Sequence, residues 1–90
     1  MDNIRTFKFY FEDEEKLITC DEYESIESLL SKYLLESNCP KTLDNVNLDF
    51  VYNTIILNSD KCKKKRIKDV FKGKKCTQLI IVIERLSVVG

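Results

Sequence analysis

Hydrophobic and polar residues alternate strictly near the start of the chain. In residues 6–11 the three phenylalanines occupy every second position, which predicts a strand with one buried face. The acidic residues 12–15 read as a solvated turn, and residues 17–20 then supply a second, returning strand. We therefore expect an N-terminal β-hairpin.

The next segment has the period of an amphipathic helix. Apolar residues recur at i, i+3, i+4, i+7 and i+8 from Ile26 to Leu34. Ser25 is a good N-cap, and the acidic Glu27 suits the positive end of the helix. Pro40 disfavours helical geometry at the residue before it, so the helix should end around residues 38–39.

The second half of the chain predicts three further strands. Residues 48–52 form one strand, residues 53–54 a turn, and residues 55–57 a short strand. The most hydrophobic segment, residues 78–84, forms the last strand. Between them lies a lysine-rich loop, in which three apolar residues are spaced for a single helical turn: Ile67, Val70 and Phe71.

Length and composition limit what this chain can do. Ninety residues predict one domain, residues 1–90 with a flexible tail at 86–90, and a domain of this size has little room for a deep catalytic cavity. No apolar run reaches the roughly 18–20 residues of a membrane span, and the N-terminus lacks the layout of a signal peptide. We expect an intracellular protein, cytoplasmic or nuclear.

Residue types that carry chemistry are scarce. The chain has no histidine, no glycine-rich phosphate loop and no recognisable acid/base pair, so we expect no enzymatic activity and no cofactor. The four cysteines are spaced singly, which predicts no metal site. Reduced thiols, some packed as small hydrophobes, are favoured over the two disulfides that a secreted protein would form.

Charge is strongly segregated although the net charge is zero. Residues 1–60 contain five basic and thirteen acidic residues, whereas residues 61–75 contain nine basic residues and one acidic residue. A basic surface is therefore expected at Lys63, Lys64, Lys65, Arg66 and Lys68. Few aromatic residues are interleaved for base stacking, and the acids elsewhere would repel a polyanion. A solvated loop, or one that attracts an acidic protein, is favoured over a nucleic-acid site.

The order of elements resembles that of the ubiquitin-like family. The resemblance covers essentially the whole chain and is carried by residues 48–57, 67–71 and 79–83. It implies an α+β fold of the ubiquitin-like β-grasp type, in which a ββαββ sheet has one main helix packed on one face and a short helical turn before the last strand. Identity to ubiquitin itself is low, so the resemblance is one of pattern.

The resemblance also implies a site for protein partners. Ubiquitin-like domains bind receptors through a small apolar patch on the exposed sheet face, and the corresponding positions here are Val51, Ile80 and Val82. If the odd-numbered residues of 79–83 point inward, alternation turns Ile80 and Val82 outward. The alternative is that the last strand is apolar on both faces because it is central and covered.

Several positions depart from the ubiquitin pattern. The hairpin tip, which supplies an apolar residue to the patch of ubiquitin, is acidic here, and Ile55 stands where ubiquitin has a lysine used for chain formation. Asp49 and Glu84 align approximately with basic residues that engage the activating enzyme. Because reversed charges weaken such a contact, these two residues should discriminate against ordinary ubiquitin activation.

Two functions remain open at this point. The favoured one is a monomeric, non-catalytic interaction domain, either alone or as the N-terminal module of a larger protein, that binds partners resembling ubiquitin receptors. The alternative is a modifier that activating and conjugating enzymes attach through Gly90, since glycine permits close backbone approach in a narrow channel. A terminal glycine occurs by chance in about 7% of chains, which favours the interaction domain.

Overall fold

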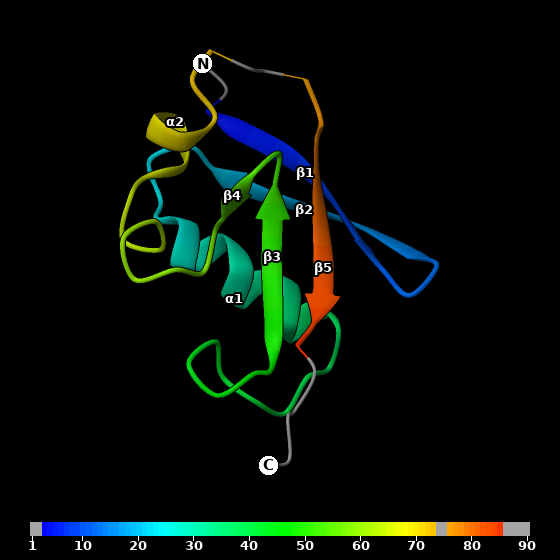
Figure 1. Ribbon diagram of the computed structural model, residues 1–90. Helices are drawn as coiled ribbons and strands as arrows, with labels where there is room; N and C mark the ends of the chain where they lie inside the picture. The colour runs from blue at the N-terminus through cyan, green and yellow to red at the C-terminus, as the bar shows by residue number, and fades with distance from the viewer. Residues whose placement is uncertain (1–2, 74–75, 86–90) are drawn as a thin grey trace.

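One mixed sheet and one long helix packed on its face form the frame of the protein (Figure 1). The computed structural model describes residues 3–73 and 76–85. Within these residues the sheet has five strands in the order β2-β1-β5-β3-β4, with β5 parallel to β1 and antiparallel to β3. The elements are β1 (Ile4–Phe11), β2 (Glu14–Asp21), α1 (Ile26–Glu36), β3 (Leu48–Tyr52), β4 (Ile55–Ile56), α2 (Ile67–Val70) and β5 (Gln78–Glu84). The predicted α+β class and element order are confirmed.

The N-terminal hairpin is tighter than its sequence suggests. Phe11 pairs directly with Glu14, so the turn consists of Glu12 and Asp13 alone. Both have positive φ, 48° and 66°, as in the type I′ turns that match the twist of a two-stranded ribbon. The expected turn at 12–15 was therefore wrong, because Glu14 and Glu15 already belong to β2.

Helix α1 begins as predicted and ends two to three residues earlier than expected. The Ser25 hydroxyl accepts a hydrogen bond from the Ser28 amide at 3.1 Å, which confirms the N-cap. At the other end, Asn38 adopts a φ of 56° and the Cys39 amide donates to the Leu34 carbonyl at 3.0 Å. This is a Schellman ending, so the chain leaves the helix before Pro40 acts.

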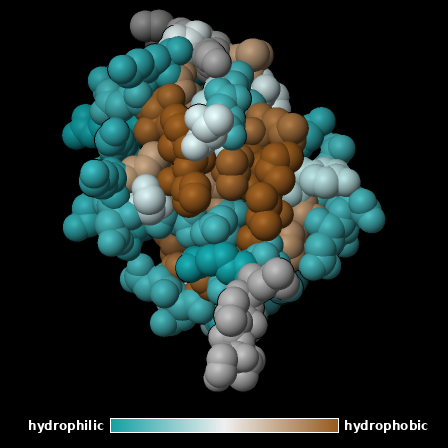
Figure 2. All heavy atoms as spheres, viewed as in Figure 1, coloured by the Kyte–Doolittle hydropathy of each residue, from teal (hydrophilic) through white to brown (hydrophobic). Residues whose placement is uncertain are grey.

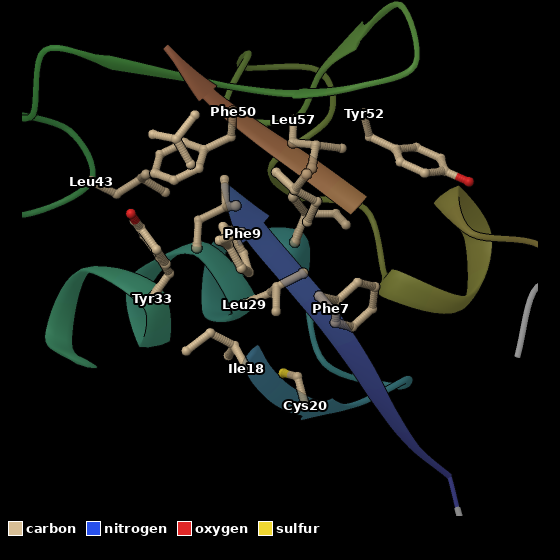
Figure 3. Close-up of a cluster of buried hydrophobic side chains, with 14 of the residues drawn as sticks. Phe7, Phe9, Ile18, Cys20, Leu29, Tyr33, Leu43, Phe50, Tyr52 and Leu57 are labelled. Carbon is tan, nitrogen blue, oxygen red and sulfur yellow. The ribbon is translucent and has the colours of Figure 1, made fainter. Parts of the chain in front are cut away.

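The core lies between the sheet and α1 and combines aliphatic side chains with two groups of aromatic rings (Figure 3). Phe9 of β1 stacks on Tyr33 of α1 with ring centroids 4.5 Å apart, and Phe50 of β3 meets both rings edge-on. A second group forms where α2 ends: Phe71 lies 4.8 Å from Phe7 and 4.4 Å from Tyr52. The short helical turn therefore closes one end of the core, as its apolar spacing predicted.

The hairpin turn generates a prediction about stability. Replacing Glu12 and Asp13 by Asn and Gly should raise the free energy of unfolding by about 1 kcal/mol, because this pair adopts positive φ at less cost than the native residues. Urea denaturation measures the change. As a control, Lys41→Gly introduces glycine at an exposed loop position without positive φ and should lower stability slightly. A neutral or destabilising turn replacement would contradict the strain at these two residues.

Candidate functional site

The central strand β5 presents its faces in the opposite phase to the one expected. Ile80 and Val82 are 0% and 5% exposed and belong to the core, whereas Leu79 and Ile83 are 49% and 50% exposed. The prediction that Ile80 and Val82 point outward is therefore wrong. Val51, the third residue of that predicted set, is half-buried in the neighbouring strand β3.

Strand pairing explains this phase. Ile80 lies opposite Phe9 of β1, and Val82 lies opposite Phe50 of β3, and directly paired residues share a face of the sheet. Since both phenylalanines are fully buried against α1, their partners are buried as well. The alternating pattern of β5 alone cannot reveal this, because its residues 79–83 are apolar on both faces.

The outward residues gather into one apolar surface, which we call the outer patch. In register, Ile81 faces Val51, and Val51 faces Ile56 of β4, so three aliphatic side chains form a row across three strands. Figure 2 shows the brown surface in the middle of this face, over β3, β4 and β5, with a largely hydrophilic border. The outer patch consists of Val51, Ile56, Leu79, Ile81 and Ile83.

Ion pairs between acidic and basic side chains border the outer patch. Lys8 of β1, which lies opposite Leu79, forms an ion pair with Glu15 at 3.3 Å. Asp49 of β3, opposite Ile83, pairs with Arg85 at 3.1 Å. Because each charge has a partner beside it, the border presents polar groups without a strong net field.

Asp49 and Glu84 do not act together as the sequence suggested. Asp49 is on the outer face and is neutralised by Arg85, whose guanidinium also donates to the Leu48 carbonyl at 3.0 Å. Glu84 is opposite the buried Leu48 and so belongs to the other face of the sheet. Their predicted role in discriminating against an activating enzyme stays a prediction, and the two carboxylates would act from different faces.

The basic segment is tied to the start of α1 through its backbone. The carbonyls of Lys65 and Lys63 accept hydrogen bonds from the amides of Ile26 and Glu27 at 2.8 and 2.9 Å. These amides belong to the first turn of the helix, where they lack partners within the helix. The segment therefore supplies a structural cap to α1.

The side chains of the basic segment divide into two groups. Lys63 forms ion pairs with Asp44 at 3.1 Å and Asp60 at 3.5 Å, and the Asp44 carboxylate raises the pKa of this amine. Lys68 places its ammonium 5.4 Å from the centre of the Tyr23 ring. Lys64, Lys65, Arg66 and Lys68 are exposed, so Lys63, which is half-buried, is the one residue of the predicted basic surface that is withdrawn from it.

The thiols are positioned as packing groups. None of the four cysteines is joined in a disulfide in the described residues, and Cys20 and Cys62 are buried. Burial and a hydrogen bond to the Glu24 carboxylate, 3.1 Å away, raise the pKa of the Cys20 thiol to about 12. Such a thiol is a poor nucleophile at neutral pH.

Within residues 3–73 and 76–85, no group of three potential metal ligands occurs.

Two further expectations concern the C-terminal tail and a possible membrane span. Gly90 and the predicted flexible tail at 86–90 lie outside the described residues, so conjugation through Gly90 stays a prediction. In the described part of the chain, no helix has the length and apolar character needed to cross a membrane.

The fold itself is that of a ubiquitin-like domain. Neither the models of known families nor the curated proteins match this sequence. Two solution structures of Arabidopsis thaliana At2g32350, one described as its ubiquitin-like domain, superpose with TM-scores of 0.72 at 15% and 17% identity, covering 99% of this chain and 95% and 85% of theirs. The UBL domain of yeast Ddi1 gives 0.68 at 20% identity, covering 98% and 96%. The chain therefore has the ubiquitin-like β-grasp fold.

The phase of β5 predicts contrasting costs for neighbouring truncations. Ile80→Ala should lower the free energy of unfolding by about 3 kcal/mol, because it leaves a cavity beside Phe9. Ile83→Ala removes a half-exposed side chain from the same strand and should cost at most about 1 kcal/mol. Chemical denaturation of both variants measures these losses. A larger loss for Ile83→Ala than for Ile80→Ala would instead support the orientation predicted from the sequence, with Ile80 pointing outward.

The raised pKa of Cys20 predicts a pH dependence of stability. Its stabilising contribution is complete below pH 9.0, the ordinary thiol value, and is lost as the pH rises toward about 12, since the unfolded chain releases the proton first. Denaturation between pH 9 and pH 11 should show a shallower decline for Cys20→Ala than for the wild type, by at most about 1.4 kcal/mol per pH unit. Cys76→Ala, at an exposed position, should keep the wild-type slope; identical slopes for all three proteins would refute the linkage.

Proposed function

We propose that this chain is a non-catalytic protein-interaction domain that binds its partners through the outer patch. The observation that carries the proposal is the row of aliphatic side chains, Ile56, Val51 and Ile81, on the sheet face opposite the helix. In a sheet with one buried face, the residues that point to solvent are normally polar. Three consecutive outward positions of β5 are aliphatic instead, which supports a face that is covered by a partner.

The composition of the outer patch supports a partner with an apolar contact surface. Its side chains are aliphatic and branched, and its charged border is already paired, as at Asp49 and Arg85. A partner would thus gain mainly from apolar burial at the centre and would meet polar groups at the rim, which is the usual anatomy of a protein interface. The likeness to ubiquitin-like domains is consistent with a protein as the partner.

The outer patch differs from the surface expected from the sequence in the residues that β5 contributes to it. Its β5 contribution comes from Leu79, Ile81 and Ile83, three side chains where two were expected. The site is accordingly broader along the strand. Conjugation through Gly90 remains the alternative prediction.

A single charge on the outer patch should abolish partner binding. Ile81→Asp places a carboxylate at the centre of the row, where burial under a partner would leave it unsolvated, and should lower affinity at least about a hundredfold. Quantitative mass spectrometry of proteins captured from lysate by tagged wild-type and variant chains measures the loss. Ile81 is half-buried on the solvated face, so the variant should keep its fold by circular dichroism.

Thr19→Asp provides the matched control. Thr19 is exposed on β2, separated from β5 by β1, and the substitution introduces the same charge outside the outer patch. Proteins retained by wild type and Thr19→Asp but lost from Ile81→Asp would support the proposal. The same set of proteins on all three chains would rule out the outer patch as the binding surface.

A further inference from the structure

A second surface lies beside β4, between the basic loop and α2. There a groove of about 450 Å³ opens between Ile55 of β4, Lys61 and Lys65 of the loop, and Val70 and Lys72 at the end of α2. In Figure 1 the loop and α2 are found on the side of β4 away from β5, so the groove is distinct from the outer patch. Its lining combines apolar side chains with several ammonium groups.

The apolar part of the groove comes from Ile55 and Val70. Ile55 pairs with the inward-facing Tyr52 and so points to the other side of the sheet from its neighbour Ile56. It nevertheless remains 40% exposed, since β4 is the edge strand of the sheet. Val70 of α2 is half-buried against the core. Together they offer an apolar contact at the margin of the sheet.

The basic part comes from Lys61, Lys65 and Lys72. All three are exposed, and none forms an ion pair within the described residues, in contrast to Lys63. Among the described residues that line the groove, Asp69 alone is acidic. Three ammonium groups around an aliphatic surface attract a ligand that carries negative charge next to an apolar group.

The backbone that carries these groups is fixed in place. Lys65 donates to the Cys62 carbonyl and its own carbonyl holds the Ile26 amide, while the Ile67 amide donates to the Glu24 carbonyl. Phe71, adjacent to Lys72, is anchored in the aromatic core. A ligand would therefore find the groove already formed and would have to order only the lysine side chains.

We propose that this basic groove binds a short acidic segment of a partner protein that bears an apolar side chain. The apolar side chain would contact Ile55 and Val70, and the flanking carboxylates would pair with Lys61, Lys65 and Lys72. A nucleic acid would use the ammonium groups but gain nothing from the aliphatic contact. The charge and the apolar surface together thus favour an acidic peptide.

The test is a titration of the isotope-labelled chain with the synthetic peptide Glu-Asp-Glu-Leu-Phe-Glu-Asp-Glu, followed by amide chemical shifts. Saturable shifts are expected in residues 55–72. Lys65→Glu should weaken the peptide about tenfold, as should Ile55→Ser. Lys64→Glu is the matched control, because Lys64 lies in the same loop with the same charge but does not line the groove; its affinity should change about twofold at most. Thermal melting verifies the fold of each variant.

Several results would overturn the proposal. They are the absence of saturable binding at millimolar peptide, equal weakening by Lys65→Glu and Lys64→Glu, and no effect of Ile55→Ser. Binding of a single-stranded oligothymidine as tight as that of the peptide, and insensitive to Ile55→Ser, would assign the groove to nucleic acid instead. A peptide with serine in place of its Leu and Phe should bind more weakly than the parent.

This site is independent of the outer patch. Ile81→Asp should leave peptide binding unchanged, because Ile81 is on β5 and takes no part in the groove. Conversely, Lys65→Glu should leave intact the protein capture that depends on Ile81. The two experiments can therefore fail separately.

Discussion

The contact between Phe9 and Tyr33 governs how the rest of the molecule is arranged. Phe9 is fully buried, stacks on the helix ring and lies beside Phe50, so it joins β1 and β3 to α1 across the strand between them. That strand, β5, must place Ile80 and Val82 beside these rings. Its remaining aliphatic residues are then forced onto the opposite face, and the outer patch is a consequence of how the core is packed.

The basic segment shows how one stretch of chain serves two purposes. Its backbone runs beside the residues that precede α1 and gives its carbonyls to the helix start, where they complement the positive end of the helix dipole. Lys63 turns to two nearby carboxylates, whereas the ammonium groups of Lys61 and Lys65 remain at the surface. Some of the positive charge of this segment is therefore paired within the folded chain, and only the unpaired ammonium groups can attract a partner.

Local signals in the sequence predict the elements well, and pairing across the sheet supplies what they lack. Ser25 fixes the start of α1, and the bounds of β3 and β5 are as predicted because each apolar run ends at polar residues. The hairpin turn was misplaced since Glu14 and Glu15 look like loop residues, although pairing with β1 makes them strand. The phase of β5 was inverted for a related reason. The inward-facing positions of β5 begin with Gln78, which accepts a hydrogen bond from the Tyr52 hydroxyl at 2.7 Å, and end with the exposed Glu84. In the sequence, the buried face of this strand therefore looks less apolar than the solvated face.

The short strand β4 keeps the two candidate surfaces apart. Its two residues pair with consecutive residues of β3, so Ile56 joins Val51 on the outer face while Ile55 turns toward the basic groove. Successive side chains of a strand point to opposite faces, and a change at one therefore leaves the other surface intact. Because β4 is the edge of the sheet, both surfaces meet solvent there.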